Sequence, residues 1–80
     1  MNRQAIQRLI DTAPPKWRKM FKRYKLGSKP SVDELIDVVL EYTPSGNLYG
    51  EEGDSIYTPP QSVRKAAMEG LRLSHANNYT

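Results

Sequence analysis

The basic residues between two prolines are the part of this sequence best suited to binding a partner. Between Pro14 and Pro30 there is no acid, and the seven bases are Lys16, Arg18, Lys19, Lys22, Arg23, Lys25 and Lys29. Lysine and arginine bind phosphate groups, and the arginine fork does so with two parallel hydrogen bonds. A basic run without acids is typical of surfaces that bind nucleic acid or another polyanion. These seven residues are therefore the candidate nucleic-acid-binding site.

A helix over residues 15–26 is expected to position these bases. Its apolar residues follow i, i+3, i+4, i+7 spacing, and they are Trp17, Met20, Phe21 and Tyr24. The bases between 16 and 25 project onto the opposite half of the helix, and Gly27 is the expected C-cap. Two other interpretations of a basic amphipathic helix remain open. It is also typical of a solvated face, and of docking on a membrane surface or in a groove of a partner protein.

The stretch 31–43 reads as the core helix around which the others pack. Ser31 followed by Glu34 predicts a capping box at its start. Its apolar residues cover an arc of roughly 200°, and they are Val32, Leu35, Ile36, Val38, Val39, Leu40 and Tyr42. The opposite side carries the acids Asp33, Glu34, Asp37 and Glu41. We expect this helix and the basic helix to share an apolar seam, with their opposite charges turned outward.

The whole chain, 1–80, is expected to form one small all-α domain of four short helices, at about 2–13, 15–26, 31–42 and 59–76. The first helix carries apolar residues at helical spacing and ends at Pro14 and Pro15. In the last, Thr58 is the expected cap. Small residues such as Ala66, Ala67 and Gly70 on its inner face predict a close approach to a neighbouring helix.

The Gly- and Pro-rich stretch 43–60 is the second candidate site. Residues 47–49 and 55–57 flank a Glu-Glu-Gly-Asp turn and are consistent with a small β-hairpin. Tyrosine in a glycine-rich loop suits protein recognition, because it offers a large contact area with a polar tip. The candidate protein-binding residues are Tyr49, Glu51, Glu52, Asp54 and Tyr57. The acids lack the spacing of a calcium loop, so we expect no metal site here.

The segment PPQSVRKAAMEGLRLSHANNYT, residues 59–80, resembles a helical segment that recurs in tailed-bacteriophage proteins. The resemblance rests on Val63, Ala66, Ala67, Gly70, Leu71 and Leu73. In those proteins a Gly-rich turn and a further helix follow, and here the chain stops at Thr80 instead. The resemblance covers about a quarter of the chain. It implies a viral, phage-encoded origin and carries no catalytic residue with it.

Several function classes have little support in the composition. The single histidine, His75, has no cysteine and no visible acid–serine partnership with which to build a catalytic or metal site, and no phosphate-loop motif is present. We therefore expect a protein that is not an enzyme and needs no cofactor. Neither a secretory signal nor an apolar run of ~20 residues is present. The expected location is the cytoplasm, that of the host cell if the protein is viral, without a membrane partner.

The sequence thus favours a small basic protein that binds nucleic acid or another polyanion through its basic helix. The alternative is a phage protein that docks on a host or virion protein through its acidic helix and its Tyr/Gly-rich loop. The sequence does not distinguish DNA from RNA.

Overall fold

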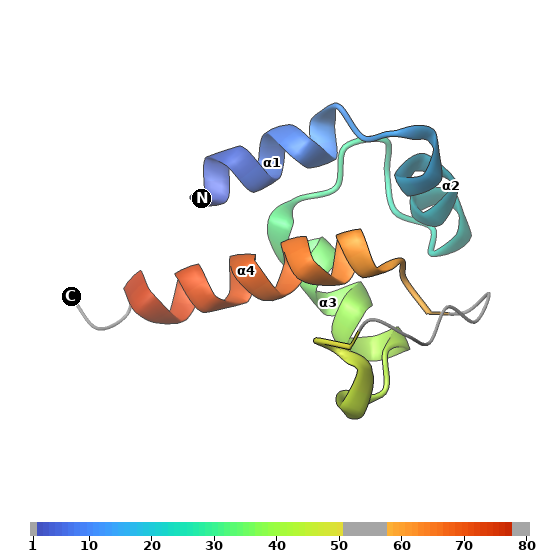
Figure 1. Ribbon diagram of the computed structural model, residues 1–80. Coiled ribbons are helices and arrows are strands. Elements are labelled where there is room, and N and C mark those ends of the chain that lie inside the picture. Colours follow the sequence, from blue (N-terminus) through green and yellow to red (C-terminus); the bar gives the residue numbers. More distant parts are fainter. Residues whose placement is uncertain (1, 51–57, 78–80) are drawn as a thin grey trace.

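Four α-helices and one short 3₁₀-helix make up the regular structure in the computed structural model, which describes residues 2–50 and 58–77 (Figure 1). In chain order these are α1 (Arg3–Asp11), α2 (Pro15–Arg23), α3 (Val32–Tyr42), the 3₁₀-helix η1 (Ser45–Asn47) and α4 (Gln61–Asn77). The predicted all-α class is confirmed at this level. No helix in these two ranges is long and apolar enough to pass through a membrane.

The small β-hairpin considered for residues 47–57 is not seen in the part of that segment that is described. Asn47 belongs to η1, and Leu48 has α-helical backbone angles of φ −57° and ψ −38°. Its proposed partner stretch, 55–57, lies outside the described residues.

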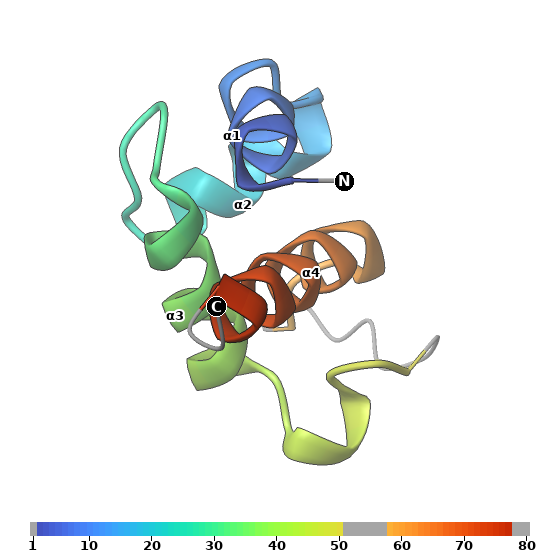
Figure 2. The ribbon, with the colours of Figure 1, turned by 90° about the vertical axis from the view of Figure 1, so that its left-hand side faces the viewer.

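α3 and α4 form the most extensive helix pair, and α1 packs against both (Figures 1 and 2). The three helices meet at Gly70. A Cβ atom built on Gly70 would lie 2.8 Å from Cγ1 of Val32, 3.5 Å from Cδ1 of Ile36 and 3.6 Å from Cδ1 of Ile6. Because the first distance is shorter than real Cβ contacts, only glycine fits here without a shift. The predicted close approach through small residues of α4 is confirmed.

α2 completes the core from one end of the molecule, beside the start of α4 (Figure 1). Its Trp17 is buried, donates a hydrogen bond from Nε1 to Oγ of Ser62 at 2.9 Å, and meets Phe21 edge to face. One contact between its C-terminal end and α3 is the ring pair of Tyr24 and Tyr42, with centroids 4.4 Å apart. The prediction that α2 and α3 share an apolar seam is therefore wrong in extent. The apolar face of α3 packs mainly against α4 and α1.

The helix ends follow the sequence signals in part. The capping box is confirmed: Oγ of Ser31 accepts from the backbone N–H of Glu34 at 3.1 Å, and the Glu34 carboxylate accepts from the N–H of Ser31 at 3.2 Å. Thr58 is not the cap of the last helix. The carbonyl of Pro60 accepts the first helical hydrogen bond, from Arg64, so Pro60 holds the N-cap position.

The end of α2 differs from the prediction as well. The helix stops at Arg23, and the residue in the left-handed region is Lys25, with φ 59°, rather than Gly27. The N–H of Leu26 bonds to the carbonyl of Phe21, and that of Lys25 to the carbonyl of Lys22. These two bonds are the Schellman pattern of a helix C-terminus. Leu26 packs on the core, and the hydrophobic anchor it supplies places the turn earlier than the glycine.

Gly70→Ala is expected to lower the free energy of unfolding by about 1 kcal/mol. Overpacking a core costs about 1–3 kcal/mol, and the gain in helix propensity of about 1 kcal/mol offsets part of it. Urea denaturation followed by Trp17 fluorescence measures the difference. Gly46→Ala is the control, because no atom lies within 4 Å of a Cβ at that position. A stabilised Gly70→Ala protein would show that the three-helix contact has room to spare.

Candidate nucleic-acid interface

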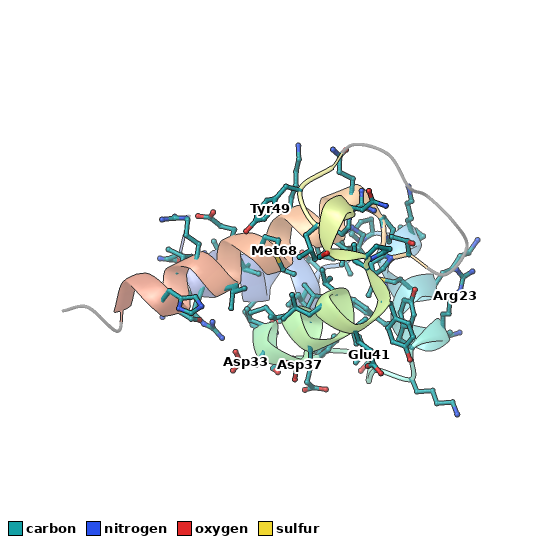
Figure 3. All side chains as sticks on the ribbon, turned by 90° about the horizontal axis from the view of Figure 1, so that it is seen from below. Arg23, Asp33, Asp37, Glu41, Tyr49 and Met68 are labelled. Carbon is teal, nitrogen blue, oxygen red and sulfur yellow. The ribbon has the colours of Figure 1, made fainter. Side chains whose placement is uncertain are left out.

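The seven predicted bases all lie on the surface, on α2 and on the segment that links it to α3. The apolar side of α2 is buried through Trp17, Met20 and Phe21, which forces its charged side to face solvent. Figure 3 shows Arg23 at the α2 end of the molecule. Sequence periodicity thus located the basic surface correctly, although it did not show which helices α2 packs against.

The acids of α3 do not neutralise this surface in the described structure. The ion pairs within residues 2–50 and 58–75 are Arg3–Asp33, at 2.8 Å, and Arg72–Glu69, at 2.5 Å. Neither involves Lys16, Arg18, Lys19, Lys22, Lys25 or Lys29. Asp33, Asp37 and Glu41 line one side of α3 (Figure 3), and all three are exposed. The positive and negative surfaces therefore remain separate features of the molecule.

Two small pockets flank α2, one beside each edge of its basic side. The Lys19 pocket, of about 240 Å³, is lined by Lys16, Lys19, Met20, Arg23, Tyr24, Thr58 and Pro60. The Lys22 pocket, of about 380 Å³, is lined by Ile10, Asp11, Arg18, Phe21, Lys22, Leu26, Gly27, Ser28 and Lys29. Six of the seven candidate residues border one pocket or the other. The basic side of α2 is thus a ridge between two depressions.

Tyr24 forms part of the floor of the Lys19 pocket and stays neutral at ordinary pH. Its burial raises the pKa of its hydroxyl, and the nearby Tyr42 adds to the rise, whereas the charge of Arg23 partly lowers it. A neutral hydroxyl donates hydrogen bonds, so it adds no negative charge to a pocket bordered by lysines.

Lys25 is the one described residue other than glycine with a positive φ, 59°. A side chain in the left-handed region costs about 1–2 kcal/mol, which glycine avoids. The chain therefore carries a basic residue at a position where glycine would stabilise the fold. Strained residues of this kind cluster at functional sites, and the charge of Lys25 extends the basic surface beyond the helix end.

The candidate protein-binding residues are only partly visible. Tyr49 is 79% exposed, whereas Glu51, Glu52, Asp54 and Tyr57 lie outside the described residues. Tyr49 borders a third depression, the Tyr49 groove, of about 710 Å³. Its lining is mostly apolar and consists of Leu9, Trp17, Tyr49, Ser62, Lys65, Ala66, Met68, Glu69 and Arg72. Sequence reasoning missed this groove because its lining comes from α1, α2, α4 and the segment after η1.

Arg64 was also missed, since helical spacing marks it only as a polar residue in α4. Its side chain is fully buried. Nη1 donates to the carbonyl of Pro59, and Nη2 donates to the carbonyl of Gly50, each at 3.0 Å. The guanidinium thus connects the two sides of the loop that joins η1 to α4, and its burial keeps it from contributing to the basic surface.

Comparison with protein-family models, with curated proteins and with solved structures found no match. The tailed-phage resemblance of residues 59–80 therefore stays a prediction. The structure gives several of its residues a packing role, because Val63, Ala66, Ala67 and Gly70 are buried on the inner side of α4. No family enters the functional argument, which rests on the surface of the molecule itself.

Lys25→Gly is expected to raise the free energy of unfolding by about 0.5–1 kcal/mol, because glycine takes up the left-handed conformation without steric strain. Urea denaturation measures the gain. Gly27→Ala is the control for the corrected position of the cap. Gly27 has no atom within 4 Å of a built Cβ and no positive φ, so we expect a change within about 0.5 kcal/mol. A much larger loss of stability in Gly27→Ala would show that Gly27, and not Lys25, caps α2.

Proposed function

We propose that this protein is a non-enzymatic nucleic-acid-binding module whose basic α2 contacts the phosphate backbone. The observation that carries the proposal is the group of seven exposed bases on α2 and on its link to α3, in a stretch without any acid. An incidental solvated surface usually mixes both signs of charge. Lys25 adds a second argument, since the fold keeps its charge in a strained conformation.

Contacts made mainly to phosphate fix the position of a protein on nucleic acid but carry little sequence information. The module would therefore bind many sequences with similar affinity. Its association would be accelerated by the positive field of α2 and weakened by salt, because each phosphate that is neutralised releases bound counterions. The alternative polyanions share this salt dependence, and a direct comparison of ligands distinguishes them.

The salt dependence of binding tests the proposal. With four or five phosphates engaged, log K is expected to fall against log salt with a slope of roughly −4, which weakens binding roughly 250-fold between 50 and 200 mM. Fluorescence anisotropy of a labelled duplex measures both quantities. Reversing Lys19 and Lys22 to glutamate is expected to abolish binding at 100 mM salt.

The matched control reverses Arg8 and Lys65, two exposed bases on α1 and α4. Both pairs change the net charge equally, which makes the control a matched one. We expect the Arg8→Glu/Lys65→Glu protein to bind within about threefold of the wild type, because neither residue lies on α2. Equal losses from both pairs would show a response to net charge alone. An absence of binding at low salt would refute the proposal.

A second candidate function is docking on a host or phage protein, and the Tyr49 groove favours it. An apolar depression bordered by an exposed tyrosine and by Leu9, which is 42% exposed, resembles the anchor sites of protein interfaces. The rim carries Lys65 and the Arg72–Glu69 pair. A partner with an apolar anchor and a carboxylate for Lys65 would fit this chemistry. The acidic side of α3 lies on the other side of the molecule from Tyr49 in Figure 3, so it would not share this contact.

Affinity purification with and without nuclease distinguishes the two functions. For docking, a partner protein remains bound after nuclease treatment, is retained by Lys19→Glu/Lys22→Glu, and is lost with Leu9→Glu/Tyr49→Glu, because these two charges would have to be desolvated in the groove. Both positions are exposed, so the fold is expected to tolerate the change, which circular dichroism checks. A partner lost only with the lysine variant would contradict docking at the groove.

A further inference from the structure

We infer that α2 inserts into the major groove of a B-form DNA duplex and places its two basic edges against the two phosphate backbones. The inference rests on the proposed nucleic-acid binding and adds the form of nucleic acid that is bound. It follows from the shape of the basic surface, which is a ridge with a pocket on each side.

The bases occupy both edges of this ridge. At about 100° per residue, Lys16 and Arg18 lie roughly 160° apart around the helix, and Lys19 and Lys22 lie between them on the crest. Lys16 and Lys19 border the Lys19 pocket, whereas Arg18 and Lys22 border the Lys22 pocket. The second lining also contains one acid, Asp11, but its three bases, Arg18, Lys22 and Lys29, outnumber it. Positive charge is thus presented in two opposite directions from one helix.

A ligand that uses both edges must present two phosphate rows with a space for a helix between them. The major groove of B-form DNA is about 12 Å wide and admits an α-helix, whose diameter with side chains is about 10–12 Å. The groove is bounded on each side by a phosphate backbone. A depression lies next to each edge of α2 in the described structure. The far wall of the Lys19 pocket includes Thr58 and Pro60, and that of the Lys22 pocket includes Ile10 and Asp11. We place the two backbones at these depressions.

Other nucleic acids fit this shape less well. The major groove of A-form RNA is deep and so narrow that side chains cannot read it, and a helix therefore cannot enter it. A single strand has one phosphate row, so it would use one edge of the ridge and leave the other solvated. Single-strand sites also combine bases with exposed aromatic rings. On α2, however, Trp17 and Phe21 are buried, and the ring of Tyr24 at its end makes a tilted contact with the ring of Tyr42.

The length of α2 sets the size of the contact. Its nine residues span roughly 14 Å, which covers about four base pairs at 3.4 Å each. Lys19 and Lys22 on the crest would then reach base edges, where lysine donates to N7 and O6 of guanine. The outer bases would hold the phosphates on either side. The expected result is a short contact with a modest preference for guanine.

The test compares three labelled ligands of one sequence at equal salt: a DNA duplex, an RNA duplex and the single DNA strand. The full chain is expected to bind the DNA duplex at least tenfold more tightly than either of the others. Bound protein is also expected to protect guanine N7 from methylation by dimethyl sulfate, because that atom lies in the major groove. Equal affinity for all three ligands, or no protection of N7, would overturn the inference and leave phosphate binding in place.

Two neutralising pairs examine the two edges separately. Lys16→Gln/Lys19→Gln removes an outer base of one edge with the crest residue beside it, and Arg18→Gln/Lys22→Gln does the same on the other edge. Each pair removes one phosphate contact, so each is expected to make the salt slope shallower by roughly 1. An effect confined to one pair would overturn the two-edge geometry. No binding of any ligand at low salt would refute the proposed function itself, so the two failures are distinguishable. All four positions are exposed, and circular dichroism confirms that the variants fold.

Discussion

The contact between α1, α3 and α4 at Gly70 is the constraint on which the rest of the structure depends. Because glycine has no side chain, Val32, Ile36 and Ile6 can converge on the backbone of α4 at this position. α4 and α1 make the more extensive contacts with α3, and Tyr42 at the end of α3 meets Tyr24 at the end of α2. α2 therefore closes the end of the core instead of lying along it. An amphipathic helix held at an end exposes its whole charged side.

The charge segregation of the molecule follows from this arrangement. Each of α2 and α3 buries an apolar side, so each turns its charges outward, and the two helices face different neighbours. Arg3 and Asp33 join α1 to α3 by an exposed ion pair of the kind that adds little stability. Hydrophobic burial dominates the packing, and the charges are left available for solvent or a partner. Packing and charge thus have separate roles in this molecule, and the charged surfaces can serve binding.

Local signals in the sequence were sufficient to predict the helices and the basic surface. They failed where contacts with residues distant in the sequence determine the structure. The capping box of Ser31 and the periodicity around Trp17 depend on neighbours within one turn or two, so they were readable. The end of α2 was misplaced because Leu26 docks on the core before Gly27 is reached. The buried Arg64 and the Tyr49 groove depend on residues brought together from several elements. No local pattern encodes such contacts.

The double hydrogen bond of Arg64 has a consequence for the evolution of the chain. By holding the carbonyls of Gly50 and Pro59 with one guanidinium, the fold closes a loop at its base. The entropy of closing a loop grows slowly, by about 0.6 kcal/mol for each doubling of its length. Insertions between these two anchor points would therefore perturb the helices little. Related chains could diversify this connection while leaving the helical core unchanged.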